Sequence, residues 1–113
     1  MFYKSGSQPT DVRINMRGGE GKVGVTPIAD VLPKNVRLAA HVELGPGDSI
    51  GEHSHVGETE IFYVLSGELE WTDGDAVYTA RPGDALYTGN GARHSVRNIS
   101  GEPTALFAVI VSE

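Results

Sequence analysis

Short apolar or alternating runs, separated by turn residues, extend along the chain from residue 23 onward. The pattern predicts nine β-strands, over residues 23–28, 36–44, 49–55, 59–65, 68–72, 76–80, 85–88, 93–98 and 104–111. The breaks hold turn sequences such as Gly45-Pro46-Gly47 and Asp73-Gly74. Only residues 27–33 leave room for a helical turn. Strands in close succession without helices between them predict an all-β fold, either an antiparallel sandwich or a barrel.

The predicted strand over residues 59–65 is mostly apolar on both of its faces. One face carries Glu60, Phe62 and Val64, and the other carries Ile61, Tyr63 and Leu65. A two-sided strand predicts that its outer face is covered, either by the N-terminal arm or by a second subunit. Residues 1–22 show no strand pattern, so we expect an irregular arm over 1–22 and a single barrel domain over 23–113.

Composition narrows the class of protein. The chain has 113 residues, no cysteine and a net charge of −6, so one domain without disulfides or thiolate metal ligands is expected. The apolar run over 105–111 is far shorter than the ~20 residues of a membrane helix. An acidic balance argues against a nucleic-acid partner. The N-terminus has no apolar signal core, which makes a cytoplasmic location the expectation.

The charge is unevenly distributed along the chain. Residues 43–84 carry ten acidic side chains and a single basic one, Arg81, whereas residues 1–42 carry more basic than acidic side chains. Two interpretations remain open: acidic groups solvated at strand edges and turns, or a negative field around a cation site in the middle of the chain.

Histidines and one carboxylate lie within this acidic region and just after it. His53 and His55 are two residues apart, so on a strand they point to the same face. Glu60 lies on the next predicted strand among apolar neighbours, where a lone buried carboxylate is costly unless it is paired. His94 lies on a later strand. A His-x-His pair alone is a weak signal, but three imidazoles and a carboxylate suit a divalent first-row transition metal.

Two longer motifs contain these residues. They are Gly47-x5-His53-x-His55-x4-Glu60-x6-Gly67 and Gly83-x5-Gly89-x-Gly91-x2-His94-x3-Asn98. The first resembles the first motif of the cupin superfamily at every position, and the second resembles its second motif except that Gly89 replaces the usual proline. The resemblance implies a small single-domain cupin with a double-stranded β-helix, a jelly-roll-like antiparallel barrel. It also implies His53, His55, Glu60 and His94 as metal ligands, and a homodimer.

The donor atoms are nitrogen and oxygen only, so Mn, Fe, Ni, Zn and Cu all remain open as the single bound metal, whereas Mg and Ca prefer all-oxygen sites. The resemblance implies a metal-dependent enzyme of dioxygenase, decarboxylase or isomerase type, acting on a small oxygenated compound such as a carboxylic acid or sugar. The alternative is a non-catalytic module that binds or senses a small ligand through the metal. Candidate catalytic residues are Glu58, Tyr63 and Arg37, each of which also fits a structural role at a turn, in the core or at a strand end.

Overall fold

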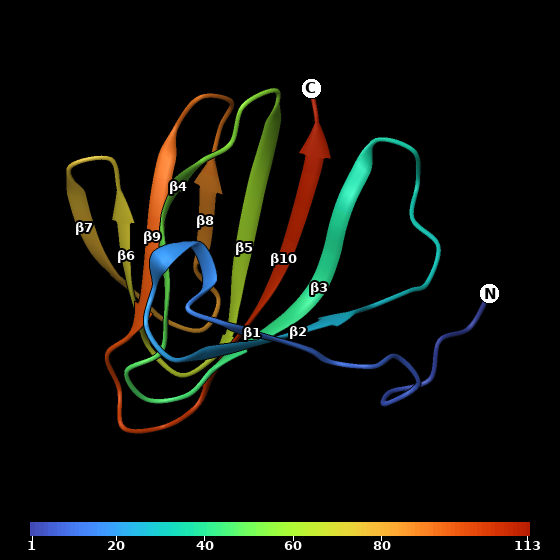
Figure 1. The fold of residues 1–113 in the computed structure, drawn as a ribbon, viewed down its shortest axis with the longest axis horizontal. Helices are drawn as coiled ribbons and strands as arrows, with labels where there is room; N and C mark the ends of the chain where they lie inside the picture. The colour runs from blue at the N-terminus through green and yellow to red at the C-terminus, as the bar shows by residue number, and fades with distance from the viewer.

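The computed structural model describes all residues, Met1–Glu113, and shows ten strands in two antiparallel sheets (Figure 1). The six-stranded sheet has the order β1 (Asp11–Ile14), β2 (Lys22–Pro27), β3 (Val36–Leu44), β10 (Thr104–Ser112), β5 (Glu58–Ser66) and β8 (Ala85–Thr88). The four-stranded sheet has the order β4 (Ser49–Ser54), β9 (Arg93–Asn98), β6 (Leu69–Asp73) and β7 (Ala76–Ala80). The all-β fold expected from the sequence is confirmed.

The core lies between the two sheets, where every second residue of the central strands points inward. In β10, Leu106, Ala108 and Ile110 are buried while their neighbours in sequence are partly exposed. Leu69 and Trp71 of β6 supply the facing layer from the other sheet. Burying an aliphatic side chain of this size contributes roughly 1.5–3 kcal/mol, so this alternation provides much of the force that joins the sheets.

The N-terminal arm is more regular than its sequence indicates. Residues Asp11–Ile14 form the edge strand β1, which pairs with β2, and a single 3-10 turn, η1, spans Met16–Gly18. All four residues of β1 are exposed, so no alternation of buried and exposed positions could reveal the strand. Residues 28–33 form no helical turn. Pro33 disfavours the helical conformation of the residue before it, which is consistent with this difference.

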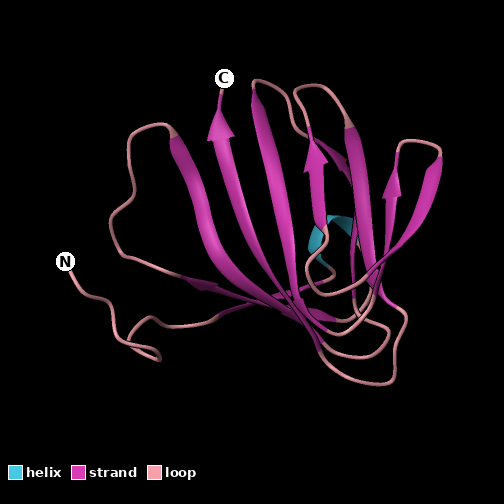
Figure 2. Cartoon of the chain, turned by 180° about the vertical axis from the view of Figure 1, so that it is seen from behind, coloured by secondary structure: helices cyan, strands magenta, loops and turns pink.

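The outer face of the six-stranded sheet is not covered by the arm. Tyr63 and Leu65 of β5 point away from the core and are 48% and 45% exposed. In the view from behind, no loop or helix crosses the middle of β10, the strand that ends at the C-terminus, or of its neighbour β5 (Figure 2). Within a single chain, the expected cover of this face is therefore missing. No helix of the structure has the length and apolar character needed to span a membrane.

Two connections join the sheets at the end of the barrel where the C-terminus lies (Figure 1). The β4–β5 turn crosses from the four-stranded to the six-stranded sheet, and the β8–β9 loop crosses back. The Gly57 N–H donates to the Asn90 side-chain oxygen at 2.7 Å, and the Gly91 N–H donates to the carbonyl of His55 at 2.6 Å. These bonds hold the ends of β4, β5 and β9 together, and the candidate ligands lie on or beside those ends.

Candidate metal centre

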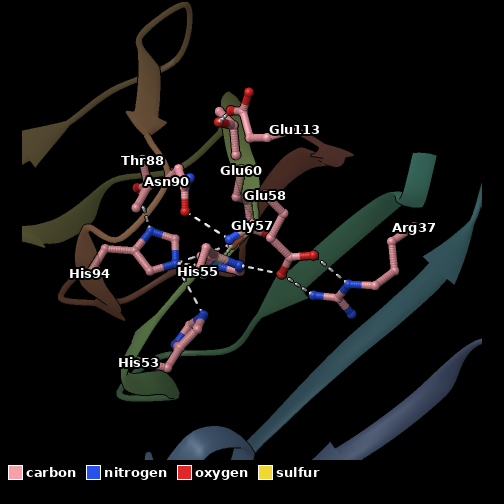
Figure 3. A network of polar contacts seen from close by, with 11 residues as sticks. Arg37, His53, His55, Gly57, Glu58, Glu60, Thr88, Asn90, His94 and Glu113 are labelled. Carbon is pink, nitrogen blue, oxygen red and sulfur yellow. Dashed lines mark hydrogen bonds and ion pairs between the residues drawn. The ribbon is translucent and has the colours of Figure 1, made fainter. Parts of the chain in front are cut away.

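The structure brings together the four side chains singled out in the sequence (Figure 3). His53 lies on β4, His55 directly follows it, Glu60 lies on β5 and His94 lies on β9. Their ligand atoms all lie within 4.8 Å of one another. The Glu60 carboxylate oxygen is 2.9 Å from Nε2 of His55 and 3.1 Å from Nε2 of His94. Four donor atoms from two sheets therefore converge on a single point.

Burial makes this cluster costly without a cation. Glu60, His55 and His94 are 5%, 2% and 1% exposed, and His53 is partly exposed. The ring of Phe62 stacks on that of His94 with centroids 5.2 Å apart, which shields the cluster on one side. A carboxylate withdrawn from water in this way requires a positive partner.

Each imidazole is oriented through its other nitrogen. Nδ1 of His53 donates to the carbonyl oxygen of Gly51 at 2.8 Å. Nδ1 of His55 is 2.9 Å from the Glu58 carboxylate, and Nδ1 of His94 is 2.7 Å from the Thr88 hydroxyl. Partners of this kind fix the ring orientation and, where they accept a proton, the tautomer of a metal-binding histidine. All three Nε2 atoms are thereby directed at the centre of the cluster.

Whether these residues fit a metal depends on which ring nitrogens present a lone pair to the centre of the cluster. A carbonyl can only accept, so the proton of neutral His53 lies on Nδ1 and its Nε2 presents a lone pair. Burial lowers the pKa of His53, which favours this neutral form. Its Nε2 lies 3.1 Å from Nε2 of His94, which in turn lies 3.2 Å from Nε2 of His55. Lone pairs and a carboxylate oxygen so close together fit a cation with nitrogen and oxygen ligands.

Glu58 and Arg37 form one unit next to the cluster rather than two separate groups. Arg37 donates two hydrogen bonds to the Glu58 carboxylate, at 2.9 and 2.7 Å, and Glu58 also contacts His55. Hydrogen bonds from Arg37 and then from His55 lower the pKa of Glu58 to about 2. Glu58 is thus held ionised as a hydrogen-bond acceptor. Tyr63, the third candidate, does not join them, because its side chain lies on the outer face of β5.

A cavity of about 140 Å³ opens beside the cluster. Its polar lining consists of His53, His55, Glu60 and three arginines, Arg13, Arg17 and Arg37. The remaining lining is apolar and comes from both sheets and the arm: Met16, Val25, Leu38, Val42, Ile50, Phe62, Ala108 and Ile110. Sites for drug-sized ligands typically have volumes of about 300–1,000 Å³, so this cavity suits a molecule of only a few heavy atoms.

Sequence reasoning missed the contribution of the arm to this cavity. Arg13, Met16 and Arg17 line it, although they belong to the segment expected to be irregular. The cluster Arg17-Gly18-Gly19-Glu20-Gly21 was the available signal, because so many glycines close together allow a tight approach to another strand. Nothing in the sequence indicated which strand that would be.

Comparisons with known proteins agree with the fold. Residues 40–110 match the family model described as "Cupin domain". An oxalate-binding protein of Thermotoga maritima is 37% identical over 108 residues, which span 93% of this chain and 89% of that protein. Quercetin 2,3-dioxygenase of Bacillus subtilis is 39% identical over 69 residues, but these span only 20% of that enzyme. The crystal structure of a predicted oxalate decarboxylase from Thermotoga maritima superposes over the whole chain with a TM-score of 0.92 at 34% identity.

Proposed function

This chain belongs to the cupin family, and from that premise we propose that it binds one divalent transition metal through His53, His55, Glu60 and His94. One observation carries the proposal: the histidine Nε2 atoms and a buried carboxylate oxygen converge within hydrogen-bonding distance of one another. Ions with nitrogen and oxygen preferences, from Mn²⁺ to Zn²⁺, all suit this ligand set. When bound, such a metal supplies a Lewis acid that polarises an oxygen ligand.

We further propose that the ligand is a small carboxylate of the oxalate type. The cavity admits only a small molecule, and three arginines are among the residues that line it. Two of the matches described above, both from Thermotoga maritima, are named for oxalate, one as a binding protein and one as a predicted decarboxylase. Arginine and a metal ion both recognise carboxylate oxygens, whereas an uncharged sugar would use neither positive charge fully.

Metal-dependent capture of the carboxylate is the function that the geometry supports best. Of the acidic or basic groups that line the cavity, the histidines and Glu60 belong to the ligand cluster, and the others are arginines. Glu58, the candidate proton-transfer group, is engaged by both Arg37 and His55. Turnover by decarboxylation or dioxygenation is the second candidate, favoured by the complete ligand set. Incubating the metal-loaded protein with oxalate while following CO₂ release and O₂ uptake separates the two.

A pair of histidine variants tests the metal site. We expect His53→Ala to lose most of the bound metal, because one of four ligands is removed, and His41→Ala to retain it. His41 lies on β3 outside the ligand cluster, so it controls for the loss of an imidazole elsewhere. Metal content is measured by elemental analysis and folding by circular dichroism.

Loading with Zn²⁺ should raise the melting temperature of the wild type and of His41→Ala, and EDTA should reverse the rise. Full metal occupancy in folded His53→Ala would contradict the proposal.

We also propose a homodimer formed through the uncovered outer face of the six-stranded sheet. Tyr63 lies opposite Phe107 of β10, and Ile61 lies between Val109 of β10 and Tyr87 of β8. These positions form one continuous apolar area across three neighbouring strands, of which Tyr63 and Tyr87 are 48% and 62% exposed. Contiguous exposed apolar area of this kind is typical of protein interfaces.

A further inference from the structure

We infer that Arg17, on the N-terminal arm, is the specificity-determining residue that selects a carboxylate dianion over ligands of smaller negative charge in the cavity beside the histidine cluster. The inference rests on the proposed function and deepens it, because it assigns recognition of the ligand's charge to a residue outside the two histidine motifs.

Arg17 is the one cavity arginine without an acidic partner. Arg13 pairs with Asp11 at 2.9 Å, and Arg37 is held by both oxygens of Glu58. Arg17 lines the same cavity, yet its guanidinium makes no ion pair and no hydrogen bond in the structure. A guanidinium offers five donors in a planar fork that matches a carboxylate. Among the three, Arg17 alone has its donors available for a ligand.

The backbone around Arg17 is held in an unfavourable conformation. Arg17 has φ 56° and ψ 30°, and Asn15 has φ 50°, so two residues other than glycine adopt the left-handed region within three positions. No other non-glycine residue in the chain has a positive φ. Such conformations are unfavourable for residues other than glycine and persist only where surrounding contacts enforce them.

The enforcing contacts tie the arm to β4, the strand that carries His53. Glu20 and Ser49 exchange two hydrogen bonds of 2.9 Å, one to the Glu20 carbonyl and one to the Ser49 hydroxyl. Gly19 packs against the backbone of Ser49, and Gly51 packs against the carbonyl of Arg17, so closely that neither glycine has room for a Cβ. Met16 packs against the core on the inner side. The loop is thus fixed before any ligand arrives, which reduces the entropy lost on binding.

Charge balance indicates the class of ligand. A divalent cation held by one carboxylate and three neutral imidazoles leaves the centre with one positive charge, and the unpaired Arg17 adds a second. Arg13 and Arg37 are each balanced by their acidic partners. A small dianion such as oxalate neutralises both charges, a monoanion neutralises one, and a sugar neutralises neither. The positive charge of the centre lies among buried side chains, where an unbalanced charge is costly, and the exposed Arg17 offers a second carboxylate its free donors, so the dianion should be preferred.

The test compares Arg17→Asn with the wild type and with Arg81→Asn. Asparagine tolerates the left-handed region better than most residues, so Arg17→Asn removes the guanidinium without straining the loop. Arg81 lies in the β7–β8 turn outside the cavity, and its replacement removes the same charge. Binding of oxalate (2−) and of oxamate (1−), which has nearly the same shape, is measured by calorimetry on Zn²⁺-loaded protein, and melting temperature is recorded for each variant.

We expect Arg17→Asn to weaken oxalate binding by at least about tenfold, the usual value of a hydrogen-bonded charge pair, and oxamate binding by less. Zinc content and melting temperature should match the wild type, and Arg81→Asn should bind oxalate as the wild type does. Oxalate affinity in Arg17→Asn within twofold of the wild type would overturn the inference while leaving the proposed function intact. If the wild type binds zinc but neither oxalate nor oxamate, the proposed ligand class fails and this inference fails with it.

Discussion

At the scale of single residues, Glu58 connects the surface of the protein with its buried centre. Its carboxylate accepts two hydrogen bonds from Arg37 on one side and one from Nδ1 of His55 on the other. Because an ionised carboxylate can only accept, it keeps the proton of neutral His55 on Nδ1 and directs the Nε2 lone pair inward. Arg37 in turn holds the carboxylate in place and ionised. A residue at the start of β5, between two of the motif's candidate ligands, therefore determines how a ligand is presented.

The residue-scale prediction concerns this orienting role. Glu58→Gln keeps the size of the side chain but removes its charge and lets it donate as well as accept. We expect the affinity for Zn²⁺ to fall about 10–100-fold, the usual effect of losing such a partner, while the fold is retained. Competition with a chelating dye measures the affinity. Glu43→Gln, at an exposed position of β3, is the matched control. Wild-type zinc affinity in Glu58→Gln would show that Glu58 merely pairs with Arg37.

At the scale of elements, the strands with alternating burial were predictable, and the arm was not. The predicted bounds of β3, β7, β8 and β9 agree with the structure, because turn sequences flank these strands. The grouping of His53, His55, Glu60 and His94 also followed from motif spacing. In contrast, β1 pairs with the nearby β2 but buries no side chain, and η1 depends on contacts with β4, which lies far away in sequence. The role of Arg17 could not be predicted from the sequence, because the position of its side chain depends on how the arm packs against β4.

The element-scale prediction concerns the docking of the arm on β4. Gly51→Ala would place a Cβ against the carbonyl of Arg17 and the N–H of Gly19, both of which are backbone atoms that cannot move independently. We expect unfolding to become easier by roughly 1–3 kcal/mol, as for other overpacked sites, and the arm to be cleaved faster by protease. Urea denaturation and limited proteolysis measure the two effects.

A second glycine variant provides the control for this prediction. Gly101 has open space around its position and no positive φ, so Gly101→Ala introduces the same methyl group without a clash. We expect its stability and its rate of proteolysis to remain close to those of the wild type. If Gly51→Ala were as stable and as resistant as Gly101→Ala, the close contact between the arm and β4 would have no energetic role.

At the scale of the whole molecule, the two faces of the six-stranded sheet differ in what covers them. Its inner face closes the core and contributes Glu60 to the histidine cluster, while its outer face is apolar and uncovered. Glu60 and Tyr63 lie on the same strand but on opposite faces, so an interface on the outer face would stiffen the strand without touching the cavity. The two-sided apolar pattern of residues 59–65 is explained in this way if a second copy supplies the missing cover.

The last prediction tests that interface. Leu65→Glu places a charge on the outer face, where desolvating it in a dimer is costly, and we expect the dimer to dissociate into monomers. Val77→Glu introduces the same change on β7 of the other sheet, at a position that is 60% exposed, and should leave the dimer intact. Light scattering after size-exclusion chromatography gives the mass, to be compared with the 12.0 kDa of one chain. Because Leu65 points away from the cavity, the Leu65→Glu monomer should still bind zinc. A monomeric wild type, or a dimeric Leu65→Glu, would mean that the apolar outer face is not the contact between subunits.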